Sequence, residues 1–193
     1  MRAVVQRVAS ASVTVDEQVI SKISRGLMVL VGIGTDDTAA DIESLSNKIL
    51  SLRVFSDASD AMWKASVKDI GGEVLCVSQF TLMANTSKGN KPDFHRAMGT
   101  EASRQLYSVF LEKMRQLYVP DRIQDGQFGA MMNVSLTNEG PVTFTLDTRK
   151  FEYITSASTS STSIDKVKKP VKPASKAPPI SQKSEPIVPS EGP

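Results

Sequence analysis

The first 33 residues alternate short apolar runs with polar turn residues, a pattern that predicts strands. Ala3–Val8 and Ser12–Val15 have the composition of strands, and Asp16–Gln18 predicts a turn that leads into Val19–Ile20. Gly26–Ile33 is an uninterrupted apolar run, which is typical of a strand buried on both faces. Because the first two strands have the pattern of a hairpin, we expect a mixed or antiparallel sheet rather than a doubly wound one.

Two later segments carry apolar residues at the spacing of a helix. The first helix is expected to begin near Asp37 or Thr38. Its buried face is expected to carry Ile42, Leu45, Ile49 and Leu52. The second helix is expected to run from Thr100, a good N-cap, to Tyr118, because Pro120 stops its continuation. Its buried stripe is expected to comprise Leu106, Val109, Phe110, Met114 and Leu117.

The remaining apolar segments predict further strands between and after these helices. These strands are expected at Arg53–Phe55, Glu73–Val77, Gly129–Leu136 and Val142–Leu146. Thr137–Pro141 is expected to connect the last two. The pattern therefore predicts an α/β fold with mixed or antiparallel sheets and two main helices.

The composition of the chain changes near Lys150. Residues 155–193 are rich in Ser, Thr, Pro and Lys and contain no aromatic residue, so they bury too little apolar surface to offset the entropy of ordering. We therefore expect one folded domain over residues 1–150 and a disordered tail over residues 151–193. The lysines of this tail can contact a polyanion, and a purely solubilising role explains the same composition equally well.

Composition and charge narrow the class of protein. The chain has 193 residues, is 40% hydrophobic and carries a formal net charge of +2, values that suit a soluble domain with a core. No apolar run approaches the roughly 18 residues of a membrane span, and residues 1–7 lack the apolar region of a signal peptide. Cys76 is the single cysteine, so we expect a buried inert thiol and a cytoplasmic location, with which a nuclear pool is compatible.

Familiar catalytic constellations are missing from the sequence. His95 is the single histidine, so a zinc site is not expected, and we expect neither a metal nor a cofactor. Gly32 and Gly34 form a Gly-x-Gly pair without the other residues of a nucleotide-binding loop. Ser78 and Thr81 are hydroxyl candidates that lack the partners of a catalytic triad.

Two segments are candidates for a functional site. Ser78–Leu82 places three hydrogen-bonding side chains at the end of a predicted strand, where ligand contacts are common in α/β sheets, although an ordinary exit from a strand has the same pattern. Gly140–Pro141 combines a glycine that can approach a ligand closely with a proline that can be cis. A simple hairpin turn explains the dipeptide as well.

Taken together, these segments resemble the D-aminoacyl-tRNA deacylases, also described as D-tyrosyl-tRNA deacylases. The matching motifs are Met1–Val8 with Ala11–Val13, Ser78–Leu82, Phe128–Val134 and Asn138–Thr143. Gly89–His95 resembles a loop of the eukaryotic members. The resemblance covers about residues 1–148 in order and leaves the C-terminal tail outside.

This resemblance implies a homodimer with active sites at the dimer interface. Gly140–Pro141 would be cis, would be braced by Arg7 and would insert into the partner's active site. The implied reaction is hydrolysis of the ester bond of D-aminoacyl-tRNA, a proofreading step in translation. Backbone carbonyls would hold the α-amino group and exclude an L side chain, and glycyl-tRNA would also fit.

The resemblance also implies which side chains form the site, and two mechanisms remain open. The catalytic residues it implies are Ser78, Gln79, Phe80 and Thr81. In the first mechanism Thr81 is the nucleophile, which requires an activating base. In the second, backbone N–H groups near Phe80 and Thr81 form an oxyanion hole and the 2′-hydroxyl of the tRNA helps to activate water. The scarcity of acid–base groups favours the second.

Two further expectations concern the binding of the terminal adenine of the tRNA and the function of the C-terminal tail. Phe128 and Met132 are expected to line the adenine pocket, and Met131 is expected to pack in the core. Vertebrate members with a polar C-terminal tail have been linked to DNA unwinding elements, so DNA or protein contact through the basic tail is a second implied function.

Overall fold

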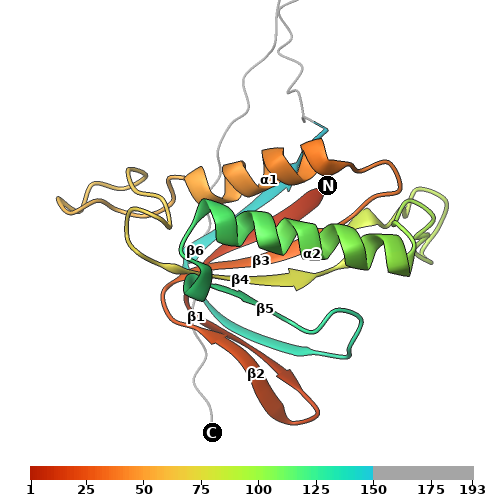
Figure 1. Cartoon of the computed structure of the whole chain (residues 1–193), viewed down its shortest axis with the longest axis horizontal. Coiled ribbons are helices and arrows are strands. Elements are labelled where there is room, and N and C mark those ends of the chain that lie inside the picture. Colours follow the sequence, from red (N-terminus) through yellow and green to blue (C-terminus); the bar gives the residue numbers. More distant parts are fainter. Residues whose placement is uncertain (150–193) are drawn as a thin grey trace, which may run out of the picture. The chain divides into compact units, whose positions relative to one another are not determined.

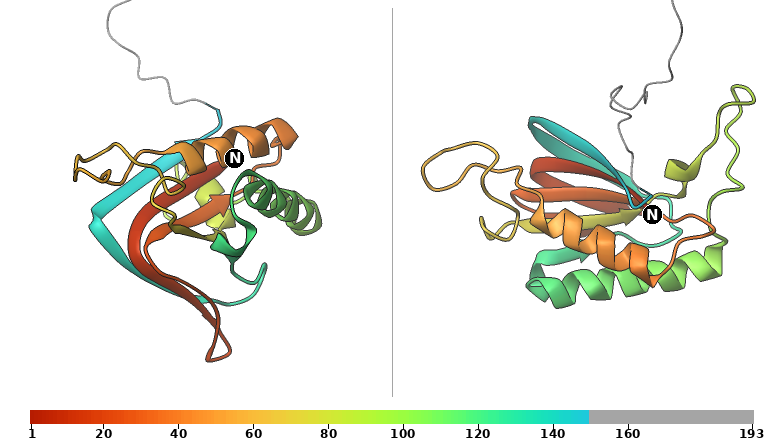
Figure 2. Two further views of the ribbon diagram at one scale, coloured as in Figure 1. Left: turned by 60° about the vertical axis from the view of Figure 1, so that its left-hand side comes forward. Right: turned by 90° about the horizontal axis from the view of Figure 1, so that it is seen from above.

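The computed structural model describes residues 1–149, which form a six-stranded sheet with two α-helices. The strands follow the order β2-β1-β3-β4-β5, and β6 pairs with β1. Figure 1 and Figure 2 show both helices on the same side of the sheet. The elements are β1 (Arg2–Val15), β2 (Gln18–Ile23), β3 (Gly26–Gly32), α1 (Ala39–Ser51), β4 (Glu73–Ser78), the 3-10 helix η1 (Phe80–Met83), α2 (Thr100–Leu117), η2 (Pro120–Arg122), β5 (Ile123–Asp125) and β6 (Asn133–Asp147).

The fold confirms the predicted α/β class with a mixed sheet. β1 is antiparallel to β2, β3 and β6, whereas β3, β4 and β5 are parallel to one another. The parallel arrangement brings the C-terminal ends of β3, β4 and β5 to one edge of the sheet. None of the helices formed by residues 1–149 is long and apolar enough to cross a membrane. The expected tail, residues 151–193, lies outside the described residues.

β1 is longer than the sequence pattern predicts. Ala3–Val8 and Ser12–Val15 belong to one continuous strand, because residues between them still pair with β6, as Ser10 does with Thr137. The predicted turn into β2 is confirmed: Asp16 and Glu17 have φ angles of 48° and 66°, as in a tight two-residue hairpin loop.

β6 is also one strand where two were predicted. Asn133–Asp147 pairs with β1 along most of its length, and the dipeptide Gly140–Pro141 lies inside it. Gln6 pairs with Thr143 and Val8 with Asn138, so the intervening residues of β6 bulge out of the ladder. Thr137–Pro141 is therefore not a hairpin turn, and the strand bends sharply in its middle (Figure 2, left).

Three other predictions about strands have mixed outcomes. The strand at Gly26–Ile33 is confirmed as β3, which is buried nearly throughout. The strand at Glu73–Val77 is confirmed and extends to Ser78. Arg53–Phe55 does not form a strand, since Phe55 makes only an isolated bridge with Ala65.

The boundaries of α1 follow the prediction closely. Thr38 is its N-cap and forms a capping box with Asp41, whose Oδ2 accepts the backbone N–H of Thr38 at 2.8 Å. The predicted apolar positions Ile42, Leu45 and Ile49 are buried. Leu52 is the half-buried C-cap residue rather than part of the helical face.

α2 differs from the prediction at its start and on its buried face. Its N-cap is Gly99, so Thr100 is the first helical residue and not the cap. Val109 is 48% exposed, although it was expected in the buried stripe. Phe110 and Met114 are buried as predicted, and Leu106 and Leu117 are half-buried against the core. Tyr107 and Leu111 are buried although they were not predicted. Tyr107 and Leu111 are four residues apart and lie on the helical face next to Phe110 and Met114, so the buried face extends away from Val109, with the tyrosine packing its ring into the core.

Candidate functional site

The segment Ser78–Leu82 follows β4 directly and crosses the end of β3. The backbone N–H of Gln79 donates to the carbonyl of Val31 at 2.7 Å, which ties the start of η1 to β3. Gly32 permits this crossing, because a Cβ atom there would lie 2.8 Å from Cβ of Leu82. The predicted motif therefore lies at the sheet edge where the parallel strands end.

The side chains of this motif hydrogen-bond one another rather than a base. Nε2 of Gln79 donates to Oγ1 of Thr81 at 2.5 Å. His95, the single imidazole, is 95% exposed at its side chain and is engaged by Asp93. Among residues 1–149, no histidine or carboxylate hydrogen-bonds to Thr81.

Phe80 is exposed at the start of η1. Its side chain is 58% exposed and meets the ring of Phe94 edge-on at a centroid distance of 5.0 Å. The first N–H groups of a helix have no acceptor within the helix. Within residues 1–149 the N–H groups of Phe80 and Thr81 also have no acceptor elsewhere, so these two donors remain available.

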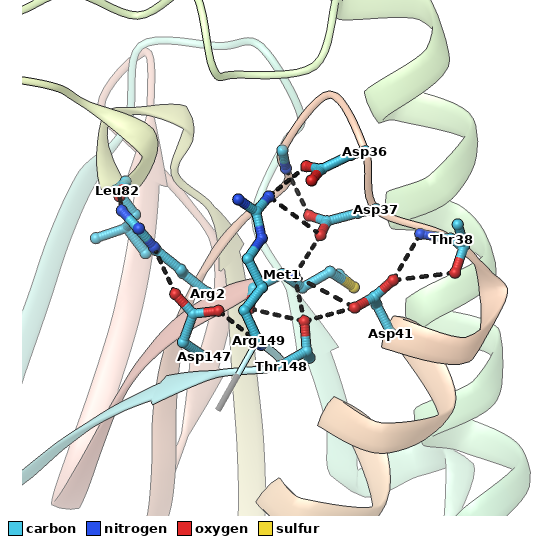
Figure 3. Close-up of polar contacts among 11 residues, drawn as sticks. Met1, Arg2, Asp36, Asp37, Thr38, Asp41, Leu82, Asp147, Thr148 and Arg149 are labelled. Atoms are coloured by element: carbon cyan, nitrogen blue, oxygen red, sulfur yellow. Dashed lines mark hydrogen bonds and ion pairs between the residues drawn. The ribbon is translucent and has the colours of Figure 1, made fainter. Parts of the chain in front are cut away.

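Arg2 links η1 to the end of β6. Its Nη1 donates to the carbonyl of Leu82 at 3.0 Å, and its Nε donates to Oδ2 of Asp147 at 2.8 Å (Figure 3). Burial alone would raise the pKa of Asp147, but hydrogen bonds from the Arg149 N–H and from Arg2 outweigh it and hold this pKa below its usual value. The sequence pattern did not single out Arg2, because its partners are 80 and 145 residues away.

The amino terminus belongs to the same network. The ammonium group of Met1 is buried and lies 2.5 Å from Oδ1 of Asp37. It also donates to Oγ1 of Thr148 at 2.6 Å, and that hydroxyl donates to Oδ1 of Asp41 at 2.6 Å. Figure 3 shows how these contacts join the start of β1, the start of α1 and the end of β6. Nothing in the sequence pattern indicated this cluster.

Phe128 and Met132 lie in the loop between β5 and β6. The loop is tied to β4 because the N–H of Gly126 donates to the carbonyl of Cys76 at 3.0 Å. Phe128 is half-buried against Tyr107, and Met132 is half-buried with its Sδ beside Gly126. Both predicted pocket residues therefore lie near the end of β4.

Two neighbouring side chains test minor predictions. Met131 is 90% exposed, so the expectation that it packs in the core is wrong. Cys76 is fully buried, and burial raises the pKa of its thiol to about 12, which confirms an inert thiol. Among residues 1–149 no group of three or more His, Cys, Asp or Glu side chains has the geometry to hold a metal ion.

The Gly140–Pro141 peptide bond is cis, as the resemblance implied. Gly140 has a φ of 117°, and a Cβ atom there would lie 2.7 Å from Nη2 of Arg7. Arg7 donates to the carbonyl of Glu139 at 3.2 Å and to that of Val54 at 2.5 Å, so it braces the dipeptide. Arg25, which the sequence analysis missed, binds both carboxylate oxygens of Glu139 at 3.1 and 3.2 Å.

The two motifs do not meet within one chain. Ser78 is in register with Val31, which pairs with Ala3, whereas Gly140–Pro141 lies opposite Arg7. The offset of four residues along β1 is roughly 13 Å, and three strand spacings are roughly 14 Å. The motifs are thus on the order of 20 Å apart. Two surface hollows, of about 520 and 160 Å³, also lie elsewhere and contain no residue of either motif.

Known proteins match this part of the chain. A family model described as D-Tyr-tRNA(Tyr) deacylase matches residues 4–147. The D-aminoacyl-tRNA deacylase of Saccharomyces cerevisiae is 54% identical over 147 residues, which are 76% of this chain and 98% of that protein. The D-aminoacyl-tRNA deacylase 1 of Homo sapiens is also 54% identical over 147 residues, which are 76% of this chain and 70% of that protein.

Two solved structures share the fold of this chain. A structure described as a c-Myc DNA Unwinding Element Binding Protein has 54% sequence identity and a TM-score of 0.74, and the match covers 76% of this chain and 98% of that one. A second, described as a probable eukaryotic D-amino acid tRNA deacylase, shares the fold with a TM-score of 0.66 at 18% identity, over 75% of this chain and 97% of that one. The chain belongs to the D-Tyr-tRNA(Tyr) deacylase family.

Proposed function

We propose that this protein hydrolyses the ester bond of D-aminoacyl-tRNA and releases free D-amino acid and tRNA. The observation that carries the proposal is the cis Gly140–Pro141 dipeptide, braced by Arg7 in a chain that belongs to this family. The reaction removes D-amino acids before they reach the ribosome, and so acts as chiral proofreading in translation. Its place of action is the cytoplasm, with a nuclear pool.

The active site is completed by a second copy of the chain. Gly140 and Pro141 are exposed in β6, which pairs only with β1 among the described strands. Because these residues lie on the order of 20 Å from Ser78 in the same chain, they reach a Ser78–Leu82 segment more readily in a partner. The homodimer therefore has two pockets, and each combines one motif from each subunit.

The dipeptide supplies the chiral selectivity. Main-chain carbonyl oxygens of Gly140 and Pro141 accept hydrogen bonds from the substrate's α-ammonium group and fix its position against a backbone wall. An L side chain would collide with this wall, whereas a D side chain points toward solvent. Glycine has no side chain to exclude, so glycyl-tRNA is also cleaved. Arg7 and Arg25 hold the wall in place through Glu139.

The first motif supplies the donors for the reacting carbonyl. The available N–H groups of Phe80 and Thr81 stabilise the oxyanion that forms when water attacks the ester, a contribution of about 3–4 kcal/mol for a donor in other enzymes. Ser78 and Gln79 position this backbone, and the ribose 2′-hydroxyl helps to activate water. No base among residues 1–149 hydrogen-bonds to Thr81, which supports this mechanism over a threonine nucleophile.

The terminal adenine lies between Phe128 and Met132. An apolar side chain suits the face of a base, and both residues are only half-buried, so each retains surface for contact. The guanidinium of Arg104 lies 4.7 Å from the centroid of the Phe128 ring and holds it from the other side.

The activity is tested by incubating the full chain with D-tyrosyl-tRNA and, in parallel, with L-tyrosyl-tRNA. We expect rapid release of D-tyrosine and no acceleration with the L substrate. Under single-turnover conditions Thr81→Ala is expected to retain most of the rate. Complete loss of activity in a correctly folded Thr81→Ala protein would restore the nucleophile mechanism, and a wild-type protein inactive on the D substrate would refute the proposed function.

The backbone donors are tested by a matched pair of substitutions. Phe80 is the first residue of η1, a position that accepts proline, so Phe80→Pro removes one N–H group at little cost to the helix. Phe80→Ala removes the same ring and keeps the N–H. We expect Phe80→Pro to lower kcat roughly a hundredfold relative to Phe80→Ala. Equal rates for the two variants would exclude the N–H of Phe80 as an oxyanion donor.

We also propose a nucleic-acid or protein contact through residues 151–193. The relative described as a c-Myc DNA Unwinding Element Binding Protein, at 54% identity, favours DNA as the contact, and Lys166, Lys168, Lys169 and Lys172 supply positive charge. A chain truncated after Lys150 should deacylate D-tyrosyl-tRNA at the full rate and lose affinity for duplex DNA. Unchanged DNA affinity would remove this second function.

A further inference from the structure

Three cations lie on the loop that follows η1 and a fourth lies on α2, and we call these four the basic border: Lys88, Lys91, Arg96 and Arg104. All four are exposed. Residues 85–104 contain these four cations and two carboxylates, a net charge of +2, which equals the formal net charge of the whole chain. Positive charge is therefore concentrated beside the site although the chain as a whole is nearly neutral.

The loop that carries three of these cations is fastened to the site. Phe94 meets Phe80 at a centroid distance of 5.0 Å, and the backbones of Asn85 and Asp93 exchange hydrogen bonds of 2.8 and 2.9 Å. The carbonyl of Arg96 accepts the N–H of Thr35 at 3.1 Å, just beyond β3. In Figure 1 this loop, between η1 and α2, lies beside the first turn of α2.

Arg104 occupies the other side of the site. It lies on α2, and its guanidinium sits 4.7 Å from the ring centroid of Phe128, the proposed wall of the adenine pocket. The basic border thus flanks both the donors of η1 and the pocket of the terminal base. A strand whose last ribose lies at this site is therefore close to cations of the border.

The charges of the basic border are not neutralised by the folded domain. None of its four members forms an ion pair with any residue from 1 to 149, whereas Arg2, Arg7, Arg25 and Arg149 all do. Of the nearby carboxylates, Asp93 is engaged by His95, and Glu101 lies exposed on α2. Unpaired exposed cations are free to replace the counterions of a polyanion.

We propose that the basic border binds the phosphodiester backbone of the aminoacylated 3′ strand of the tRNA. This inference rests on the proposed function, which places the terminal ribose at η1. Contacts to phosphate position a nucleic acid without reading its sequence, so a border of this kind accepts many tRNAs. It also provides a local concentration of positive charge. Without it, a chain of net charge +2 would attract a polyanion only weakly.

The test compares two substrates that differ in phosphate. One is D-tyrosyl-tRNA and the other is D-tyrosyl-adenosine, which has the terminal ribose and base but no phosphodiester. Three variants of the full chain are compared with the wild type. The first carries both Lys88→Ala and Lys91→Ala, the second carries Arg96→Ala, and the third, Lys48→Ala, is the control. Lys48 is an exposed cation in the last turn of α1.

We expect the double variant to lower kcat/KM for D-tyrosyl-tRNA about tenfold at low salt and to leave the value for D-tyrosyl-adenosine within about twofold. The dependence of log kcat/KM on log salt should flatten by about 0.7 for each lost phosphate contact. Lys48→Ala should match the wild type throughout. Equal effects on both substrates, or an unchanged salt slope, would overturn the inference, whereas a wild type inactive on both substrates would instead overturn the proposed function.

Discussion

The guanidinium of Arg2 donates a hydrogen bond to the main-chain carbonyl of Leu82, with 3.0 Å between Nη1 and the oxygen, while its Nε binds the carboxylate of Asp147. One side chain therefore joins the start of β1, the end of β6 and the last turn of η1. Asp147 is 5% exposed at its side chain, so the pair is shielded from water on the carboxylate side. This contact ties down η1, the segment that carries the proposed oxyanion donors.

Arg2 is therefore expected to be a positioning residue. Arg2→Ala should lower the single-turnover rate with D-tyrosyl-tRNA about tenfold and change KM by less than about twofold, because misplaced donors act on the transition state more than on binding. Arg2→Lys, which keeps one donor and the charge, should recover part of the rate. The control is Arg149→Ala, since Arg149 pairs with Asp36 in the same cluster without touching η1. An Arg2→Ala protein with the kinetics of Arg149→Ala would contradict this role.

The carboxylate of Asp147 makes the stability of the domain depend on acid pH. Burial opposes its ionisation, but hydrogen bonds from Arg149 and Arg2 lower its pKa below the ordinary value of 3.8. A group with a lowered folded-state pKa stabilises the protein above the unfolded pKa, and that contribution disappears as the pH falls through the folded pKa. Asp147→Asn should thus lower the free energy of unfolding at pH 7 and make it less dependent on pH below about 4. Urea denaturation between pH 7 and pH 2.5 measures both effects, and parallel curves for the two proteins would contradict the expectation.

Tyr107, which is buried, and Tyr118, which is half-buried, allow a test of how the hydrogen bonding of a tyrosine hydroxyl affects stability. Oη of Tyr107 is buried and has no hydrogen-bond partner among residues 1–149, whereas Oη of Tyr118 donates to the carbonyl of Gly72 at 2.9 Å. A buried polar group without a partner costs stability, so Tyr107→Phe should raise the free energy of unfolding by about 1 kcal/mol. Tyr118→Phe should lower it by about 1 kcal/mol. Urea denaturation of the three proteins gives both differences, and destabilisation by Tyr107→Phe would indicate a partner for that hydroxyl.

Local sequence patterns predicted the elements of the fold better than their extent. The start of α1 and the apolar run of β3 are determined by a few neighbouring residues, so both were predicted correctly. β1 and β6 continue through positions that look like breaks, because each supplies hydrogen-bond partners to the other across roughly 120 to 145 residues of sequence. Pairing at that range leaves no periodic signal, which is why Gly140–Pro141 resembled a turn.

The residues of the candidate site also fall into two groups, those with a local sequence signal and those whose contacts arise only in the folded chain. Ser78 and Thr81 could be singled out because they follow an apolar strand, and Arg7 because it belongs to a motif. Arg2 lies in the same motif, but its contacts and those of Arg25 could not be predicted, since their partners are 80 to 145 residues away. The buried position of Met1 among carboxylates is likewise a product of tertiary packing.

The proposal that each pocket combines motifs from two subunits predicts how a mixture of two inactive variants behaves. Gly140→Ala should lower deacylation at least a hundredfold, because the added Cβ lies 2.7 Å from Nη2 of Arg7 and a φ of 117° disfavours a side chain. Phe80→Pro should inactivate the other half of the pocket. When the two variants are unfolded together and refolded as a mixture, mixed dimers contain one pocket with both intact motifs and one pocket with both changes.

An equal mixture should therefore recover about a quarter of the wild-type activity, since half of its dimers are mixed and each has one working pocket of two. Each variant refolded alone provides the control and should stay inactive, and size-exclusion chromatography confirms that all three samples have the same oligomeric state. If the pocket were instead built within one chain, every subunit in the mixture would carry one defect. The mixture would then show no recovery, which would exclude a site shared between subunits.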